Sequence, residues 1–502
     1  MANGTLAFGP FLLDPARGAV LRDGAPVALG QRALAVLQVL AETPGRTVGK
    51  AELLSRAWPG TIVEEGNLTV QIAALRKALG PGPDERDWIA TVPRVGYRLL
   101  ADGAPPPDAP VGLPVLAVLP FQVLGGSADD AHFADGVIAD IVGALGRFRS
   151  FTVAAVPGGS ELRDPARGLG ARYLLRGSVR RAGDRLRIAA ELMDAAASTH
   201  LWAEHYDGPA TDVFGFQDRI SRGIATAIEP KIQAAEIGRG RRERPESAAV
   251  YDISLQARAK MLTESERANA DVHALLIRAL AVEPDNARML AHAAWAIEHR
   301  GAMGWPPFAP DDRERCADLA RRGLQHAAGD AQVMAHCGMA ILQCVKDYDW
   351  GMAVLDAAAA DNPNDLVVVN EAGTGHLHCG SLETALAYYR RALELNPRHP
   401  LAHGSHCGMA HAQIVLGNHA QALESAARAL ALNPSFDCTL WMLVAANAHL
   451  GRIDEARRHL KNLLRLAPEV TVARIRAGQP AKDPSRIEPI LTALRLAGLP
   501  AE

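Results

Sequence analysis

The sequence predicts a multidomain α+β protein with three structured parts, and its 502 residues change pattern twice. The first hundred residues mix short alternating strands with amphipathic helices. After a proline-rich stretch, strands and helices alternate, and from about residue 248 the chain is alanine-rich and repeats one helical phrase. A chain of this length is expected to hold several domains, each with an apolar core of its own.

The amino-terminal segment, residues 1–101, predicts strands, three helices and a closing hairpin. Residues 4–29 alternate apolar and polar side chains around Arg22-Asp23-Gly24, which is a hairpin turn signal. Helical spacing follows in residues 31–42 and 49–57, and Trp58-Pro59-Gly60 then forces a loop before a third helix. Two short strands, 89–92 and 96–100, surround a turn that carries Arg94. This order of elements predicts a winged helix-turn-helix.

The third helix, which ends at residue 79, has one apolar and one polar face. Its apolar residues recur at steps of four, three and four, so they share one buried face; they are Leu68, Ile72, Leu75 and Leu79. The opposite face is short, polar and uncharged, and carries Asn67, Val70, Gln71 and Ala74. Arg76 and Lys77 close the helix, where they complement its dipole and come within reach of phosphates.

The same segment resembles the OmpR/PhoB type of winged helix, and especially its CadC-like branch, over residues 5–101. The matching segments come in one order along the chain: Phe8-Gly-Pro-Phe11, Arg22-Asp-Gly24, Val27-Ala-Leu29, Ala57-Trp-Pro-Gly60, Val63-Glu-Glu65, Asn67-Leu-Thr69, Thr91-Val-Pro93 and Gly96-Tyr-Arg98. In that family the third helix enters the major groove of DNA and the tip of the hairpin reaches the minor groove. The loop before the third helix touches RNA polymerase.

Carried over by position, the resemblance implies a specific set of DNA contacts. Base edges would be met by Asn67, Thr69, Val70 and Gln71, the phosphate backbone by Arg76, Lys77 and Arg98, and the minor groove by Arg94. The loop Trp58–Glu65 would touch RNA polymerase. Strongly basic relatives have arginines where this chain has Ala73 and Ala74, which lowers the expected phosphate contribution of a single module.

Charge supports the expectation of weak binding by one copy. The formal net charge of the chain is −3, and the first hundred residues are nearly balanced, so no strong basic field drives non-specific binding. We therefore expect binding to promoter DNA in pairs, as a homodimer. The alternative interpretation of this segment is an ordinary α+β domain whose arginines are solvated at the surface.

The next segments predict a spacer and no membrane anchor. A semi-stiff proline-rich linker is expected over residues 102–112, which begin with Asp102-Gly-Ala-Pro-Pro-Pro-Asp-Ala-Pro110. CadC-like relatives often carry a membrane span at this place. No apolar run approaches the roughly 20 residues that cross a bilayer, and the six cysteines lack C-x-x-C spacing. These features predict a cytoplasmic, reduced protein that does not bind membranes.

Residues 113–208 predict a compact α/β domain. A buried strand at 115–119 is followed by a helix at 129–145 and by strands at 151–155, 173–181, 186–193 and 199–206. This segment resembles the TolB-amino-terminal-like (TolB-like) domain through Leu116-Ala-Val-Leu-Pro-Phe121, Phe133-Ala-Asp-Gly-Val137, Gly170-Ala-Arg-Tyr-Leu-Leu-Arg-Gly-Ser178 and Leu201-Trp-Ala-Glu-His-Tyr206. The resemblance implies no transferable chemistry. A connecting helix and basic linker are expected over residues 209–247.

An acidic group in this domain has two interpretations. Asp129, Asp130, Asp135 and Asp140 are the residue type that holds a metal ion or accepts a phosphoryl group. Asp129 and Asp130 also stand where a helix begins, and carboxylates there complement the helix dipole. We favour the structural interpretation.

Residues 248–470 predict an all-α solenoid of stacked helical hairpins. Arg391-Ala-Leu-Glu-Leu-Asn-Pro397, Arg428-Ala-Leu-Ala-Leu-Asn-Pro434 and Asn462-Leu-Leu-Arg-Leu-Ala-Pro468 repeat one phrase at spacings of 37 and 34 residues. Each proline follows a glycine by 17 residues, at Gly380, Gly417 and Gly451, a pattern that resembles tetratricopeptide repeats. About six units are expected, with residues 471–502 as a tail and capping helix.

In the tetratricopeptide family, the first helix of each unit lines a concave surface that binds a peptide or protein partner. By position, the resemblance places Asn370, Thr374, Cys407, His411 and Trp441 in that groove. A second hypothesis concerns a metal or haem site, because five histidines and two cysteines gather between His376 and Cys407, with His411 just beyond. Their registers point to different faces and no structural-zinc spacing occurs, so we expect no metal and no cofactor.

Two classes of function follow. There is no Walker loop, dinucleotide glycine fingerprint, nucleophile elbow or kinase or cyclase signature, so we expect no enzyme activity. The favoured function is a sequence-specific DNA-binding transcriptional regulator whose TolB-like and repeat domains sense a signal or partner. The alternative is a tetratricopeptide scaffold in a signalling complex without specific DNA binding.

Overall fold

The structure is a computed structural model of the whole chain. It describes residues 6–8, 10–14, 19–22, 25–27, 29–42, 48–58, 65–80, 88–92, 96–99, 113–124, 128–156, 169–244, 247, 249–480 and 482–502. The chain divides into two compact units, Met1–Gly112 and Leu113–Glu502, which are described separately. The predicted proline-rich linker, residues 102–112, lies outside the described residues.

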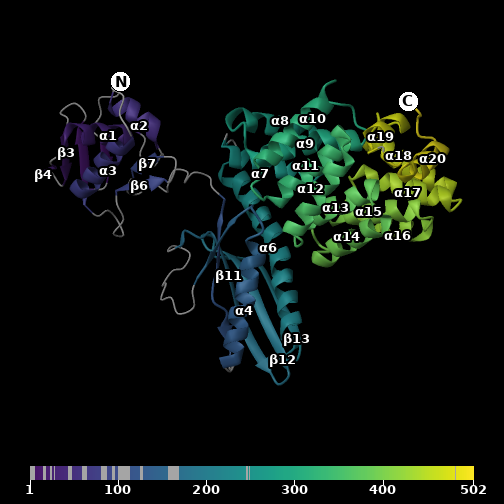
Figure 1. Cartoon of the computed structure of the whole chain (residues 1–502), viewed down its shortest axis with the longest axis horizontal. Coiled ribbons are helices and arrows are strands. Elements are labelled where there is room, and N and C mark those ends of the chain that lie inside the picture. Colours follow the sequence, from purple (N-terminus) through teal and green to yellow (C-terminus); the bar gives the residue numbers. More distant parts are fainter. Residues whose placement is uncertain are drawn as a thin grey trace. The chain divides into compact units, whose positions relative to one another are not determined.

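The first unit confirms the predicted winged helix-turn-helix (Figure 1). It opens with a four-stranded antiparallel sheet in the order β1-β2-β3-β4, formed by β1 (Leu6–Phe8), β2 (Phe11–Asp14), β3 (Ala19–Arg22) and β4 (Ala25–Val27). Three helices follow: α1 (Gln31–Ala41), α2 (Lys50–Ala57) and α3 (Glu65–Leu79). A second sheet, in the order β5-β7-β6, combines β5 (Val48–Gly49) with the hairpin β6 (Ile89–Val92) and β7 (Gly96–Leu99).

One apolar core joins these elements of the first unit. Leu37 of α1, Leu53 of α2 and Leu75 of α3 have no solvent exposure and belong to the same cluster. The rings of Phe11 and Trp88 meet edge to face with centroids 5.5 Å apart, which ties the first sheet to the start of the hairpin. Sequence reasoning missed β5, because a strand of two residues is too short to show an alternating pattern.

The second unit begins with a six-stranded mixed sheet. Its order is β10-β8-β11-β12-β13, with β9 beside β11, and the elements are β8 (Val115–Val118), β9 (Gln122–Val123), β10 (Thr152–Ala155), β11 (Tyr173–Ala182), β12 (Arg185–Asp194) and β13 (Thr199–Pro209). The strands β10, β8 and β11 are parallel, whereas β11, β12 and β13 form antiparallel pairs. The predicted α/β segment is therefore confirmed as a small sheet region.

Two helices cover one face of this sheet, α4 (Ala128–Leu145) and the long α6 (Val213–Glu243), which lie side by side in Figure 1. Their apolar residues, such as Ile141 and Ile224, share a core with Tyr173 and Ile188 of the strands. Burial alternates along β12, as expected for a sheet with one solvated face. The helix α6 thus contributes to the apolar core beneath the sheet. The domain boundaries predicted for the connecting helix and linker, residues 209–247, stay predictions.

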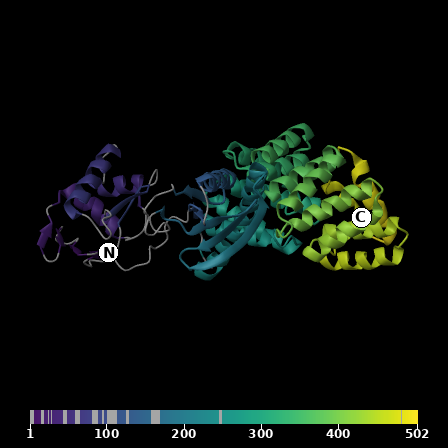
Figure 2. The same cartoon turned by 90° about the horizontal axis from the view of Figure 1, so that it is seen from below.

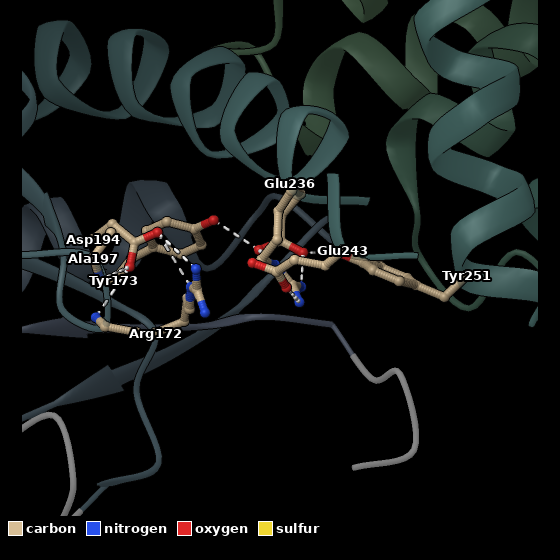
Figure 3. Close-up of polar contacts among 9 residues, drawn as sticks. Arg172, Tyr173, Asp194, Ala197, Glu236, Glu243 and Tyr251 are labelled. Carbon is tan, nitrogen blue, oxygen red and sulfur yellow. Dashed lines mark hydrogen bonds and ion pairs between the residues drawn. The ribbon is translucent and has the colours of Figure 1, made fainter. Parts of the chain in front are cut away.

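The carboxyl half of α6 joins the sheet to the helical repeats. Glu236 is 1% exposed and accepts hydrogen bonds from the hydroxyls of Tyr173 on β11, at 2.7 Å, and Tyr251, at 2.9 Å. Arg239, one turn further along α6, pairs with the same carboxylate and lies 3.6 Å from Glu243. Figure 3 shows this group between the sheet and the helix that carries Tyr251. A buried carboxylate therefore connects three elements.

The repeats form six helical hairpins, as the sequence predicts. They are α7 (Val250–Met261) with α8 (Glu266–Val282), α9 (Ala287–Ala302) with α10 (Asp312–Gln325), α11 (Ala331–Ala340) with α12 (Tyr348–Asp361), α13 (Leu366–Cys379) with α14 (Leu382–Leu395), α15 (Ala402–Val415) with α16 (His419–Leu432), and α17 (Asp437–His449) with α18 (Ile453–Leu466). A π-helical turn, η2 (Ile341–Val345), extends α11. Gly417 and Gly451 turn the chain between paired helices with φ of +78° and +73°, where glycine is strain-free.

The chain then turns back through α19 (Val472–Gly478), the 3₁₀ turn η3 (Pro484–Arg486) and α20 (Glu488–Ala497). The helix α20 packs against the last hairpin, whereas α19 packs on α9 near the other end of the repeats. Figure 2 shows these yellow helices against the green repeat helices. Sequence reasoning expected only a tail and capping helix here.

We predict that Glu236→Ala destabilises the second unit by roughly 3–5 kcal/mol, because Arg239 and two tyrosine hydroxyls lose their buried acceptor. The free energy of unfolding is measured in the intact chain by urea titration followed by far-ultraviolet circular dichroism. Glu243→Ala is the matched control: its carboxylate is half exposed, so its loss should cost less than about 1 kcal/mol. Equal effects of the two substitutions would contradict the assignment of Glu236 as the connecting residue.

Candidate nucleic-acid interface and repeat cavity

The helix α3 presents the surface that the sequence predicts. Leu68, Ile72, Leu75 and Leu79 are at most 2% exposed and hold the helix against the core. Asn67, Thr69 and Val70 are exposed on the other side, Val70 by 61%, and Gln71 is half-buried. The helix therefore offers short, uncharged side chains to a partner, with two alanines, Ala73 and Ala74, beside them.

The two basic residues at the end of α3 differ in their surroundings. Arg76 donates hydrogen bonds from Nε and Nη2 to the carbonyl oxygen of Ile89, at 2.9 and 2.7 Å, so it fastens α3 to the first strand of the hairpin. Lys77 is exposed. The phosphate role expected of Arg76 stays a prediction, and the structure gives this guanidinium a positioning role as well.

The predicted tip of the hairpin and the polymerase loop lie largely outside the described residues. This holds for Arg94 and for residues 59–64. Arg98 is described only as backbone within β7, opposite Ala90 of β6. These contacts stay predictions.

The five residues predicted to line the repeat groove come together. Asn370 and Thr374 of α13, Cys407 and His411 of α15, and Trp441 of α17 all line one cavity of about 150 Å³. Its walls also include residues of α9, such as Trp295 and Glu298, so it spans from the second hairpin to the last. The first helices of the second to the last hairpin thus contribute residues to one cavity wall.

The returning carboxy-terminal chain lies along this cavity. We call residues 472–480 and 482–490 the crossing segment. Gln479 Nε2 donates to the carbonyl oxygen of Ala302 at 2.8 Å, and Lys346 Nζ donates to the carbonyl oxygen of Gln479 at 2.6 Å. Arg486 Nη2 donates to the carbonyl oxygen of Gly380 at 3.1 Å. The crossing segment therefore bonds to the carboxyl ends of α9, η2 and α13.

Two further contacts join the crossing segment to the last two repeats. His411 Nε2 lies 2.6 Å from the carbonyl oxygen of Arg486, and His449 Nε2 lies 3.2 Å from that of Pro489. Gln479 and Ile487 consequently form part of the cavity wall. The predicted groove is narrowed by the protein's own chain, a feature with no signal in the repeat pattern because it depends on where a non-repeating tail folds back.

Sequence reasoning also missed two carboxyls in the cavity wall, the buried Glu298 and the partly buried Glu371. Burial raises the pKa of Glu298 to about 7, although a hydrogen bond from Gln343 and the charge of Lys346 act in the opposite direction. Burial raises the pKa of Glu371 well above its usual range, and the carboxylates of Glu298 and Glu264 raise it further. Both stand on the inner faces of first helices, where an isolated glutamate gives no sequence signal.

Two of the histidines that suggested a metal site pair with carboxylates. His403 pairs with Glu264, and His376 lies 3.0 Å from Asp356. Burial lowers the pKa of His403, but the Glu264 carboxylate and a hydrogen bond to it more than offset this, so the pKa is raised. Among the described residues, no three His, Cys, Asp or Glu side chains are placed to hold a metal ion.

The acidic group of the α/β domain likewise has structural partners. Asp130 is 1% exposed and accepts a hydrogen bond from Arg181 Nε at 2.6 Å. Asp140 accepts one from Gln217 Nε2 at 2.6 Å, which links α4 to α6. Asp129 and Asp130 stand in the first turn of α4. These contacts favour the structural interpretation of the group.

We predict that Glu298 makes stability depend on pH. Its folded pKa, about 7, exceeds the unfolded value of about 4.5, so the folded state binds more protons between these pH values and stability falls as pH rises through them. Relative to Glu298→Gln, the intact protein should lose on the order of 3 kcal/mol between pH 5 and pH 8. Urea unfolding at several pH values measures the difference between the two proteins, in which the titrating groups that do not interact with Glu298 cancel. Parallel curves for the two proteins would contradict the assignment.

Two family models match the chain. Residues 24–99 match "Transcriptional regulatory protein, C terminal", and residues 376–399 match the tetratricopeptide repeat. The resemblance of residues 113–208 to the TolB-like domain stays a prediction. Among the described residues, no helix combines the length and the apolar character that crossing a membrane requires.

The similar proteins include transcriptional regulators and a protein named as a putative adenylate cyclase. A "Putative adenylate cyclase 3" of Rhizobium meliloti is 32% identical over 237 residues, which are 45% of this chain and 40% of that protein. The "Transcriptional regulatory protein CutR" of Streptomyces coelicolor is 40% identical over 88 residues, 17% of this chain and 39% of CutR. The chain thus spans about two fifths of the length of these two relatives.

A solved structure, "DNA binding domain of E. coli CadC", is 30% identical, with a TM-score of 0.18; the match covers 20% of this chain and 95% of that domain. The matched residues 24–99 hold the three helices and the hairpin described above. The amino-terminal domain of this chain therefore belongs to the OmpR/PhoB-type winged-helix family of transcriptional regulators, and the same chain carries tetratricopeptide repeats.

Proposed function

We propose that the chain is a sequence-specific transcriptional regulator that binds promoter DNA through α3. The observation that carries this proposal is the uncharged outer face of α3, opposite a buried apolar face: Asn67, Thr69 and Val70 are exposed, and Gln71 beside them is half-buried. A major groove admits an α-helix, and Asn and Gln side chains pair with adenine through two hydrogen bonds. A face of this kind has no evident use in a protein scaffold.

The remaining DNA and polymerase contacts belong to the same proposal. Lys77 and Arg98 would reach phosphates, Arg94 would enter the minor groove, and the loop Trp58–Glu65 would touch RNA polymerase. Because α3 carries only two basic residues and one of them bonds to Ile89, a single module gains little from phosphate contacts. Binding as a homodimer to paired sites follows from that weakness.

The second unit would supply the signal. Tetratricopeptide repeats favour binding of a protein or another partner, and α6 links the small sheet to the repeats through Glu236. A partner or ligand of the repeats would therefore act on a body that also includes the α/β domain. This role needs no catalysis by the chain.

We predict that Gln71→Ala relaxes base preference. Loss of one bidentate base contact should reduce discrimination between the preferred site and a single-base variant by roughly 1–3 kcal/mol, that is, about 5- to 150-fold, with little change in the salt dependence. Titrations of the intact chain against both duplexes measure the ratio of Kd values. An unchanged ratio would remove Gln71 from the interface.

We predict that Arg94→Ala weakens binding to all sequences to a similar degree and lowers the slope of log K against log salt by about 1, because a cation inserted between phosphates is lost. Titrations at several salt concentrations measure the slope. Lys77→Ala on α3 is the comparison for a phosphate contact outside the hairpin. Wild-type binding that does not discriminate among duplexes would favour a scaffold without specific DNA binding.

A further inference from the structure

The wall of the cavity between the first helices of the repeats contains acidic side chains, and the nearest cation that acts on Glu298, Lys346, lies outside that wall. Glu298 on α9 and Glu371 on α13 both border it, and among the described residues of its wall none is Lys or Arg. The third acid, Glu264, is already paired with His403. His336 Nδ1 lies 3.8 Å from the carboxyl of Glu371, but burial lowers the pKa of His336 to about 4, so it supplies no charge there near neutral pH.

Several polar atoms of the wall are buried without a partner. His299 Nε2, Gln343 Oε1 and Trp441 Nε1 have no hydrogen-bond partner among the described residues, and these side chains belong to residues that are 8%, 7% and 2% exposed. Leaving a buried donor or acceptor unpaired costs free energy, so such atoms in a cavity indicate a missing polar partner. These unpaired atoms are an observation separate from the carboxyl groups, and both indicate a ligand in the cavity.

Aromatic rings form another part of the wall. The rings of Trp295 and His299 are stacked with centroids 4.7 Å apart, and the ring of Phe436 continues the stack 6.4 Å from His299. All three residues line the cavity. Aromatic faces attract cations, and indole does so most strongly. Carboxylates beside such faces are suited to a positively charged group attached to an apolar body.

The size of the cavity limits the ligand. A volume of about 150 Å³ is on the scale of a site that holds benzene. A second cavity of about 100 Å³ adjoins it and shares Trp295, Asn370 and Glu371. Arg258 lines this second cavity rather than the first, and has its own carboxylate, Glu229, at 3.9 Å. A volume of this size favours a small ligand over an extended peptide.

We propose that this cavity binds a small organic cation, a protonated amine on a compact apolar body, through Glu298, Glu371 and the aromatic rings. The ligand would contact α9, α13 and the crossing segment together, because Gln479 and Ile487 share the wall with both carboxyls. The binding of the cation does not depend on the proposed function. Only its role as the signal that the second unit senses rests on that function.

The test uses three probes with the same four-carbon body: n-butylammonium, n-butanol and n-butyrate. Calorimetric titration of the intact chain at pH 7.5 should show saturable binding of n-butylammonium at one site, with a Kd in the micromolar to millimolar range expected for so few atoms. n-Butanol should bind at least about tenfold more weakly and n-butyrate should not bind. Affinity for the ammonium ion should rise from pH 6 to pH 8 as the carboxyls ionise.

Variants locate the site. Glu371→Gln and Glu298→Gln should each weaken binding of n-butylammonium at least about tenfold, whereas Glu424→Gln, on the exposed side of α16, should leave it unchanged. Thermal unfolding verifies that each variant is folded, and two carboxyl variants keep the test valid if one is not. Equal binding of the three probes, preference for n-butyrate, no saturable binding of n-butylammonium, or unchanged binding in both variants would overturn the proposal.

A DNA titration of the same protein separates the two proposals. Specific DNA binding without amine binding refutes only the cavity ligand. Amine binding without specific DNA binding refutes the regulatory function and leaves the cavity assignment intact.

Discussion

The burial of one face of α3 is the constraint on which the DNA-binding surface depends. Four apolar side chains hold the helix against the core of the first unit, and that fixed orientation is what exposes Asn67, Thr69 and Val70 together. Arg76 adds a second restraint, since its two hydrogen bonds to Ile89 set the hairpin against the end of α3. These contacts hold the end of α3 and the first strand of the hairpin together, and a rigid surface loses less entropy on binding.

Two segments outside the repeat pattern, α6 and the crossing segment, link the parts of the second unit to each other. The helix α6 contributes to the core of the sheet and also reaches the repeats, where the buried Glu236 joins it to α7 and β11. The crossing segment bonds to the ends of successive first helices and shares a cavity wall with them. A solenoid is otherwise held only by contacts between neighbouring repeats. These two segments tie distant repeats to each other and to the sheet, so a ligand in the cavity would act on the whole unit.

How far the sequence predicts the structure depends on whether a feature is periodic. Periodic patterns predict which side chains face inward, as the steps of four and three in α3 and the recurring phrases of the repeats do. The five residues predicted for the repeat groove share one cavity; they are Asn370, Thr374, Cys407, His411 and Trp441. Features that depend on contacts between distant segments have no such signal. β5 is two residues long, Gln479 meets Ala302 across 177 positions, and the depth at which Glu298 and Glu371 lie is set by the packing of several helices.

Sequencing of the DNA fragments that the intact chain retains from its source genome tests the central claim most directly, because the operator need not be identified beforehand. If α3 reads base edges, the retained fragments should share a short sequence, present in two copies about one helical turn of 10 base pairs apart, as paired modules require. Retained fragments that reproduce the composition of the input DNA, with no shared sequence, would contradict the assignment of α3 as a DNA-reading helix.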